Sequence, residues 1–498
     1  MSIDPISALL GTASPWEWWR GVDDLWRWGL HAQKIWAYDA ADEARRAEIR
    51  RERLADMIEH ARTRSAFYRA HWRHVPPGCE DLSAYPPVSR GQLMANFDDW
   101  VIDPDLRKAD LLKFVADPGR IAEPYLGKYA VWTSSGTTGL PGIYVQDADA
   151  LALYSALMTC RFDLGASVAD PRALVPEPAR LAFIAAVEGH FAGVVSWERQ
   201  RRIHPAIGAS ARAFSILQPL PELVAALNDW RPAFVASYPT MLMLLARERA
   251  EGRLAIEPRA LWCGGEGLTQ ADRAAIEGAF GCPVVEDYGA SECMNMAFAC
   301  RHGRLHVNDD WVVLEPVDEQ GRPVPPGEAS ASVLVTNLAN RVQPLVRYDL
   351  SDSVTLDASP CPCGCGRPSV RIEGRRDDVL LLRRTGQGKG EVRILPLAIE
   401  TVIEEQAGVY RFQLVQTAPD AMSLRIEVAD DAERAKAFTR VKRVLARYLK
   451  AQGAAPVALS LDLLPPEANP VSGKLRQVRA LPPGSLQPTL TPTSAPMP

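Results

Sequence analysis

Apolar, β-rich segments alternate with helical segments between Tyr129 and Gly289, and this alternation constrains the fold more than any other feature. "YAVWTSS" precedes "DALALYSALMTCRF", "AFVASYP" precedes "TMLMLLARERA", and "RALWCGGEG" precedes "TQADRAAIEGAF" and "PVVEDYG". Strands and helices in rotation are typical of α/β folds with a parallel sheet. Ligands bind such folds at the carboxyl ends of the strands. We therefore expect an α/β protein whose site lies in the turns that follow these strands.

Two later regions differ in pattern. Residues 305–354 alternate apolar and polar side chains and are rich in Val and Thr, which predicts antiparallel strands. Beyond "RIEGRRDDVLLL", two strand patterns and the basic amphipathic segment "AERAKAFTRVKRVLARYLKAQ" predict a small α+β unit. The expected protein is thus a large multi-subdomain body with parallel sheets and a β-rich subdomain (1–376), followed by a small mobile α+β lobe (377–481). The Pro-, Ser- and Thr-rich tail, 482–498, is expected to be disordered.

The region before the alternating segments has two features of its own. Residues 41–72 predict one long amphipathic helix, because apolar residues recur on one side at Ile49, Leu54, Met57, Ile58 and Ala61. Five tryptophans lie between Trp16 and Trp28. Aromatic side chains dominate buried contacts, so these residues are expected to pack onto the body, with a patch for a partner or a membrane surface as the alternative.

Composition excludes several classes of protein. Of the 498 residues, 47% are hydrophobic and 23% are charged, as in ordinary globular proteins. The net charge of -5, without a basic block, argues against a nucleic-acid partner. The start of the chain lacks the pattern of a signal peptide, and no segment approaches the ~18 apolar residues of a membrane span. We expect a cytoplasmic protein without a membrane span, whose oligomeric state is open, a homodimer being one option.

The segment "VWTSSGTTGLPG", residues 131–142, combines glycines with hydroxyl side chains. Glycine lets a ligand approach the backbone closely, while hydroxyl and N–H groups bind anions. This composition predicts a phosphate-binding loop, with a solvent-exposed turn as the alternative. The Walker spacing G-x-x-x-x-G-K-[ST] does not occur, which argues against a P-loop kinase or ATPase.

Six motifs in order resemble the adenylate-forming superfamily of acyl-CoA synthetases: "TSSGTTGLPG", "CGGEGL", "VVEDYGASE", "PLVRYDLSD", "RIEGRRDDVL" and "NPVSGKLRQVR". The fourth motif and the "CPCGCGRP" segment after it are similar to the phenylacetate-CoA ligase branch. The resemblance, over about residues 45–478, implies an AMP-forming ligase. Such an enzyme activates a carboxylic acid, aromatic in this branch, with ATP to an acyl adenylate and transfers the acyl group to CoA. The alternative keeps adenylation but uses an amine or a carrier-protein thiol as acceptor.

The resemblance assigns residues to each part of ATP. It places Glu292 on Mg²⁺, a cation that prefers carboxylate and phosphate oxygens. It places Ser291 at the α-phosphate, and Asp352 and Arg375 at the ribose, although "YDLSD" has Leu-Ser where relatives have Thr-Gly. The residues at the β- and γ-phosphates are Thr133, Ser134, Ser135, Gly136, Thr137, Thr138 and Gly139. Those around the adenine are Gly265, Glu266, Asp287, Tyr288 and Gly289.

The resemblance also implies two functional positions toward the end of the chain. Lys474, in "NPVSGKLR", is the expected catalytic lysine, which stabilises charge between the attacking carboxylate and the α-phosphate. Asp377 is the expected hinge, about which the small lobe rotates between the two half-reactions. The following loop is longer and more basic than in relatives. Its Arg383, Arg384 and Lys389 either bind CoA phosphates or are solvated charges.

Thiols and imidazoles are concentrated in "CRHGRLH" and "CPCGCGRP". An odd total of nine cysteines argues against a disulfide scaffold, and such a donor set suits tetrahedral Zn²⁺. The branch resemblance implies the ligands Cys300, His306, Cys361 and Cys363. His302 and Cys365 are the substitutes, and free structural thiols are the alternative.

For the carboxylic acid the resemblance implies a pocket formed by Tyr238, His190, Phe191 and Gly264. His190 is equally compatible with a hydrogen-bonded structural role.

Overall fold

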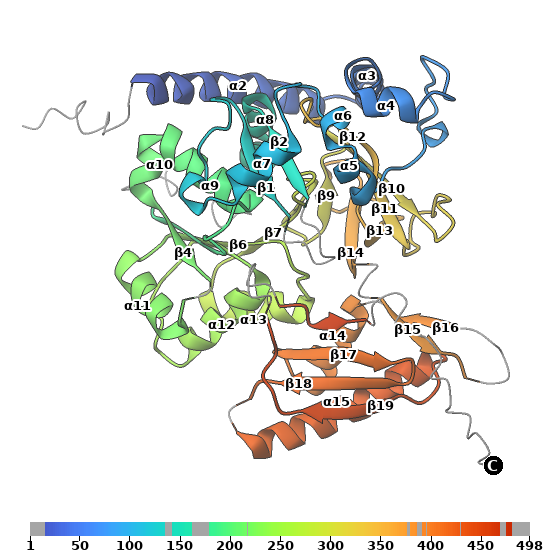
Figure 1. The fold of residues 1–498 in the computed structure, drawn as a ribbon. Helices are drawn as coiled ribbons and strands as arrows, with labels where there is room; N and C mark the ends of the chain where they lie inside the picture. Colours follow the sequence, from blue (N-terminus) through green and yellow to red (C-terminus); the bar gives the residue numbers. More distant parts are fainter. Residues whose placement is uncertain are drawn as a thin grey trace, which may run out of the picture. The chain divides into compact units, whose positions relative to one another are not determined.

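The computed structural model describes residues 15–134, 142–161, 179–216, 218–375, 379–385, 391–394, 396–428, 430–468 and 475–480 (Figure 1). The chain divides into two compact units. Among the described residues, the first comprises those up to Ile372 and Ala468, and the second comprises Glu373 to Glu467 and the residues from Leu475 on. The boundary predicted at 376/377 and the tail 482–498 lie outside the described residues.

The first unit is built on a nine-stranded sheet of order β13, β14, β9, β8, β7, β6, β5, β3, β4. Five neighbouring strands are parallel: β3 (Leu181–Ala185), β4 (Ala211–Ser215), β5 (Phe234–Ser237), β6 (Ala260–Cys263) and β7 (Val284–Tyr288). Antiparallel pairing extends the sheet through β8 (Ala297–Ala299) and β9 (Leu305–Val307) to β14 (Ser369–Arg375), beyond which lies β13 (Asp352–Leu356). The predicted α/β class and the change to antiparallel strands are confirmed. The first strand of the predicted alternation, β1 (Ala130–Thr133), is an exception, because it pairs antiparallel with β2 (Ile143–Gln146) outside this sheet.

Helices cover both faces of the parallel strands (Figure 1). The helices α11 (Leu220–Trp230), α12 (Pro239–Ala250) and α13 (Gln270–Phe280) share one apolar core with the sheet. On the other side lie α8 (Ala148–Arg161), α9 (Ala192–Ile203) and α10 (Pro205–Ser210). The start of α13 follows from its sequence, because the Thr269 side chain accepts a hydrogen bond from the Asp272 amide at 3.1 Å.

Smaller sheets and N-terminal helices complete the first unit. The hairpin of β1 (Ala130–Thr133) and β2 (Ile143–Gln146) brackets the predicted phosphate loop. A three-stranded antiparallel sheet comprises β10 (Val312–Val317), β11 (Ser332–Asn337) and β12 (Leu345–Asp349). The helices are α2 (Pro15–Asp39), α3 (Glu43–Arg64), α4 (Ala66–His71), α5 (Arg90–Ala95), α6 (Phe97–Trp100) and α7 (Lys108–Val115), with 3-10 turns at Leu82–Ala84 and Pro118–Arg120.

The prediction of one helix across residues 41–72 is wrong at Ser65. The backbone of Ser65 is extended (φ -98°, ψ 124°), so α3 ends at Arg64. The Ser65 side chain then caps α4 by accepting from the Tyr68 amide at 3.4 Å. A serine that bonds nearby backbone amides competes with helix propagation, and apolar periodicity does not reveal this.

The second unit has its own apolar core. Its four-stranded sheet has the order β19 (Ala458–Asp462), β18 (Ala421–Ile426), β17 (Phe412–Ala418), β20 (Val478–Arg479). A separate hairpin pairs β15 (Leu380–Arg383) with β16 (Glu391–Ile394), and the helices are α14 (Pro396–Ala407) and α15 (Asp431–Ala451). The predicted amphipathic helix corresponds to α15, whose buried residues are Ala437, Val441, Val444, Leu445 and Leu449.

Candidate active site

Three parallel strands carry most of the predicted site at their carboxyl ends. The register aligns Ser237 of β5 with Cys263 of β6, and Cys263 with Glu286 of β7. Because the three strands end together, the turns after them start from one edge of the sheet. These ends carry Tyr238, Gly264, Gly265, Glu266, Asp287, Tyr288 and Gly289.

Close packing holds the turn after β6 in place. The Asp287 carboxylate accepts a hydrogen bond from Trp262 Nε1 at 2.7 Å. A Cβ atom at Gly264 would lie 2.3 Å from the same carboxylate oxygen, so only glycine fits there. Glu266 accepts from the Thr240 hydroxyl at 2.8 Å, which ties this turn to the start of α12. Sequence analysis missed the supporting residues Trp262 and Thr240.

The predicted adenine and ribose residues meet directly. The hydroxyl of Tyr288 donates to Asp352 Oδ2 at 2.8 Å, although β7 and β13 are not neighbours in the sheet. Ser351, just before Asp352, has a left-handed backbone (φ 64°). The turn thus has the conformation that favours glycine, the residue that the motif resemblance leads us to expect there, and Asp349 supports it by accepting from the Ser351 amide at 3.0 Å.

Glu292, the predicted Mg²⁺ ligand, is buried among three donors. Its Oε1 accepts from the hydroxyl of Tyr144 at 2.7 Å, from the hydroxyl of Tyr348 at 2.9 Å and from Arg90 Nη2 at 3.1 Å. Burial, and then the Glu292 charge, raise the pKa of both tyrosines, so each hydroxyl remains a donor. These contacts hold the carboxylate in one orientation. Sequence analysis missed the donors, although Tyr348 lies within the quoted "PLVRYDLSD".

The base of the predicted phosphate loop is closed by two hydrogen bonds. The Ser134 amide donates to the Gly142 carbonyl at 3.0 Å, and the Gly142 amide donates to Ser134 Oγ at 2.9 Å. The neighbouring Trp132 Nε1 donates to the carbonyl of Ser291, the predicted α-phosphate residue, at 2.8 Å. The hairpin is therefore joined to the turn that carries Glu292. The rest of the loop, Ser135, Gly136, Thr137, Thr138 and Gly139, lies outside the described residues.

The predicted acid-binding residues come from two places. Tyr238 and Gly264 follow β5 and β6, whereas His190 and Phe191 precede α9. His190 Nε2 donates to the Asp117 carbonyl at 2.9 Å, and the His190 carbonyl accepts from the Thr133 amide at 2.6 Å, which are contacts of a structural histidine. Burial, and then the charge of Glu266, raise the pKa of Tyr238 to about 12, so its hydroxyl stays protonated at neutral pH.

Lys474, the hinge residue Asp377 and Lys389 lie outside the described residues. Arg375 ends β14 and belongs to the second unit. Arg383 is 66% exposed with its Nη1 3.6 Å from Asp420 Oδ2, a position that is compatible with CoA binding and with a solvated charge alike.

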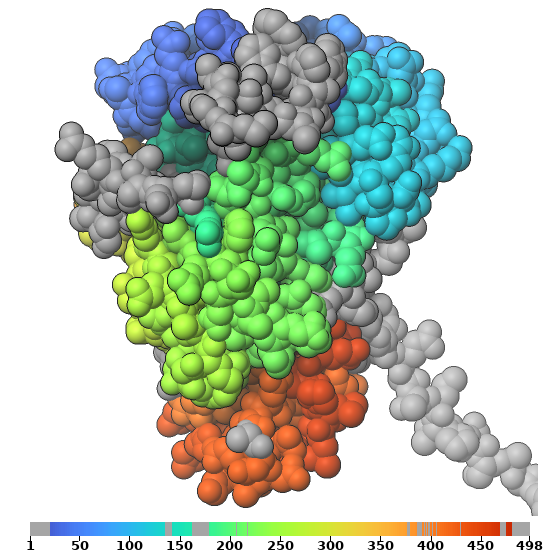
Figure 2. Space-filling model, turned by 90° about the vertical axis from the view of Figure 1, so that its left-hand side faces the viewer, coloured from blue at the N-terminus to red at the C-terminus, as the bar shows by residue number. Residues whose placement is uncertain are grey.

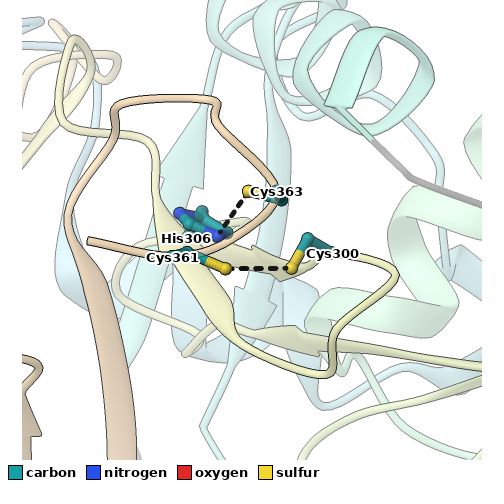
Figure 3. Close-up of side chains that lie close together, drawn as sticks. All are labelled: Cys300, His306, Cys361 and Cys363. Atoms are coloured by element: carbon teal, nitrogen blue, oxygen red, sulfur yellow. Dashed lines mark hydrogen bonds between the residues drawn. The ribbon is translucent and has the colours of Figure 1, made fainter. Parts of the chain in front are cut away.

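The predicted metal ligands are brought together (Figure 3). The ligand atoms of Cys300, His306, Cys361 and Cys363 all lie within 4.8 Å of one another. Cys300 Sγ is 3.7 Å from Cys361 Sγ, and Cys363 Sγ is 3.3 Å from His306 Nε2. Cys300 and His306 flank the β8–β9 turn, and the other two belong to the segment between β13 and β14.

The substitute ligands lie outside this group of four. Cys365 Sγ lies 3.2 Å from His306 Nδ1, on the other side of the ring, where the Arg367 carbonyl is also 3.0 Å away. His302 contributes its backbone amide, which donates to Cys300 Sγ at 3.4 Å. Three thiols and one imidazole form a donor set that suits tetrahedral Zn²⁺, and a backbone carbonyl on the second ring nitrogen is a common orienting contact.

Fold and site together define a nucleotide-binding α/β enzyme of the adenylate-forming class. The chain belongs to the AMP-binding enzyme family, whose profile matches residues 32–337. Among the described helices, none has both the length and the apolar character needed to cross a membrane.

Relatives agree with this assignment. A phenylacetate-coenzyme A ligase of Aromatoleum evansii is 24% identical over 432 residues, which cover 82% of this chain and 87% of that protein. Protein CapK of Staphylococcus aureus is 27% identical over 221 residues, which are 43% of this chain and about half (46%) of CapK. A 2-hydroxyisobutyryl-CoA ligase structure in the postadenylation state matches with a TM-score of 0.64 and 20% identity, covering 89% of this chain and 90% of that one. The predicted resemblance to the phenylacetate-CoA ligases is confirmed.

Proposed function

We propose that the protein is an AMP-forming acyl-CoA ligase, with aromatic carboxylic acids as the first candidate substrates. The observation that carries the proposal is the convergence of the Glu292 cluster, the Tyr288–Asp352 pair and the closed base of the phosphate loop in one family fold. An aromatic acid, phenylacetate, is named for one relative, the phenylacetate-coenzyme A ligase.

In the proposed reaction, a carboxylate oxygen of the acid attacks the α-phosphorus of ATP, and the bond to pyrophosphate breaks. The sulfur of CoA then attacks the acyl carbon of the adenylate, the thiol proton is lost, and AMP leaves. Asp352, held by Tyr288, accepts hydrogen bonds from the ribose, and Ser134 and Gly142 hold the loop that binds the phosphates. In the first step the negatively charged carboxylate approaches the negatively charged phosphates of ATP. Hydrogen-bond donors placed where charge develops therefore lower the barrier to this step.

Glu292 would hold Mg²⁺, which supplies positive charge to the phosphate oxygens. The residues fit this role because the carboxylate is already buried and oriented by Tyr144, Tyr348 and Arg90. Lys474 would supply a second positive charge during adenylation, and residues 377–481 would form the lobe that carries it. These two assignments rest on the motif resemblance.

We also propose a structural zinc ion on Cys300, His306, Cys361 and Cys363. The four ligand atoms lie close enough for one ion, and zinc would tie the segment between β13 and β14 to the β8–β9 turn. A site closed by four protein ligands has no open position for catalysis, so its contribution is to folding.

The test is a substrate screen with the purified chain. Phenylacetate, benzoate, 2-hydroxyisobutyrate and related acids are incubated with ATP and Mg²⁺, with or without CoA, and the products are identified by mass spectrometry. Acyl-CoA formation with release of AMP and pyrophosphate supports the proposal. Acyl adenylate formation that CoA does not consume would instead favour transfer to an amine or a carrier-protein thiol. ATP turnover that no acid stimulates would contradict both.

A further inference from the structure

The helix α2 presents an apolar face to solvent. Five of its side chains belong to the exposed large hydrophobic residues, and no other element of the described chain carries as many. Their exposed fractions are 40% for Val22, 58% for Leu25, 69% for Trp26, 43% for Leu30 and 58% for Trp36. Contiguous apolar surface of this kind marks an interaction site more often than single exposed residues do.

These residues form one stripe of the helix. Val22, Leu25, Trp26, Gly29, Leu30, Gln33 and Trp36 are exposed and follow the i, i+3, i+4, i+7 spacing of a single helix face. The opposite face already packs onto the body, where it buries Asp24, His31, Ala32, Ile35 and Tyr38. The helix therefore has a second apolar face in addition to the one that attaches it. Figures 1 and 2 show α2 at the outer surface of the first unit.

The stripe is self-complementary about Gly29. Val22 and Trp36 stand at equal distances before and after this glycine, and Asp23 and Lys34 occupy the same flank of the stripe near its two ends. A two-fold axis through Gly29 would place Val22 opposite Trp36 of an antiparallel copy, and would bring Asp23 to within one residue of the level of Lys34. A Cβ atom at Gly29 would meet nothing within 4 Å, so the backbone is open to close approach at the centre.

We propose that α2 pairs antiparallel with α2 of a second copy of this chain, forming a two-fold symmetric homodimer. Charge favours a second copy over a membrane surface. The exposed residues of the stripe and its flank include one acidic residue, Asp23, which also pairs with Arg27 of the same helix at 2.8 Å, and one basic residue, Lys34, so they carry no cluster of positive charge. Helices that lie on anionic membranes carry clusters of Lys and Arg instead. The proposal does not depend on the reaction that the protein catalyses.

Sedimentation velocity of the full chain tests the interface. We expect a dimer at micromolar concentration and a monomer for Trp26→Glu, which inserts a charge into the stripe. Gly29→Trp should also give a monomer, because it blocks close approach while leaving open space in the single chain. Leu112→Glu, at a 44% exposed position of α7, is the matched control and should remain dimeric. Thermal unfolding verifies that each variant is folded.

A charge exchange tests the register. Asp23→Lys and Lys34→Asp should each weaken dimerisation about tenfold, since each places like charges opposite one another at both ends of the pair. The double variant restores opposite charges and should recover the wild-type dissociation constant, although the pair of Asp23 with Arg27 within the helix is lost in it. A monomeric wild type, a dimer unaffected by Trp26→Glu, or a double variant no tighter than the single ones would overturn the proposal. So would a monomer that binds phosphatidylcholine and phosphatidylglycerol vesicles through Trp26.

Discussion

At the scale of single residues, Glu292 shows how the fold buries and orients a carboxylate that we propose as a Mg²⁺ ligand. A buried carboxylate is costly unless it is paired and hydrogen-bonded. Here Arg90, Tyr144 and Tyr348 all donate to the same oxygen, Oε1, although they come from segments up to 258 residues apart. Glu292 directly follows Ser291, whose carbonyl accepts a hydrogen bond from Trp132 of β1 at 2.8 Å.

We predict that Glu292→Gln lowers acid-dependent pyrophosphate exchange about 100-fold or more, as removal of one charge-stabilising group does in other enzymes. The amide keeps the size of the side chain and can still accept from both tyrosines, so the chain should fold. The loss should be accompanied by a higher Mg²⁺ requirement, measured by titrating exchange with Mg²⁺. Glu315→Gln is the control, because Glu315 also pairs with an arginine, Arg347, at 3.1 Å. Equal loss in both variants would contradict the assigned role.

At the scale of elements, β7 serves both the site and the core. Its last residues, Asp287 and Tyr288, contact Trp262 and Asp352, while Glu286 lies against α13, where Arg273 Nη2 is 2.9 Å away. Burial raises the pKa of the Glu286 carboxyl to about 7, because the loss of hydration exceeds the attraction of Arg273. The folded state therefore binds this proton more tightly than the unfolded chain does.

The raised pKa predicts how stability depends on pH. As pH rises from about 4.5 to 7, the unfolded chain loses this proton while the folded state keeps it, so ionisation favours unfolding and the contribution of Glu286 to stability falls by about 3 kcal/mol. Glu286→Gln removes this dependence and should gain stability relative to wild type between pH 5 and pH 8. Urea unfolding followed by tryptophan fluorescence measures it, because all 13 tryptophans precede Ile372 and report on the first unit. Glu328→Gln, at an exposed turn, should show no such relative change.

The elements themselves could be predicted from local patterns, whereas the contacts between them could not. Strand and helix alternation located β5, β6, β7, α12 and α13, and the Thr269 cap fixed the start of α13. Apolar periodicity predicted one helix across Ser65, but it does not reveal that the Ser65 side chain bonds the Tyr68 amide and separates α3 from α4. The role of Arg90 had no local signal, since its partner Glu292 lies 202 residues away. Motif resemblance named Tyr288 and Asp352 but not the hydrogen bond that joins them.

The Cys/His cluster is the second case in which separate elements meet. We predict close to one zinc ion per chain in protein purified without chelators, measured by elemental analysis. Cys361→Ser should lose the metal and lower the unfolding temperature, because the segment between β13 and β14 then loses its metal-mediated tie to the β8–β9 turn and keeps weaker contacts, such as the hydrogen bond from Arg304 to the Ser359 carbonyl. Cys79→Ser, outside the cluster, is the control and should keep the metal. Wild-type protein that contains no metal would contradict the zinc site and support the alternative that these cysteines are free structural thiols.

At the scale of the whole molecule, the two units carry different parts of the proposed reaction. The first unit contains the strand ends, the Glu292 cluster and the base of the phosphate loop. The second has a separate core, so substitutions on its surface need not disturb the nucleotide residues. Because the proposed reaction has two steps, we expect some residues to act in one step only. The motif resemblance assigns Lys474 to the adenylation step.

Lys474→Ala should reduce adenylation by about 100-fold to 1,000-fold, because an ammonium group no longer stabilises the charge that develops as carboxylate and α-phosphate join. Thioester formation from a supplied acyl adenylate should change less than about threefold, since that step begins after pyrophosphate has left. Single-turnover assays of each half-reaction separate the two effects. Lys450→Ala, at an exposed position near the end of α15, controls for loss of a surface charge and should affect neither step. Equal loss in both half-reactions would show that Lys474 supports the fold or the binding of the nucleotide instead of the adenylation step.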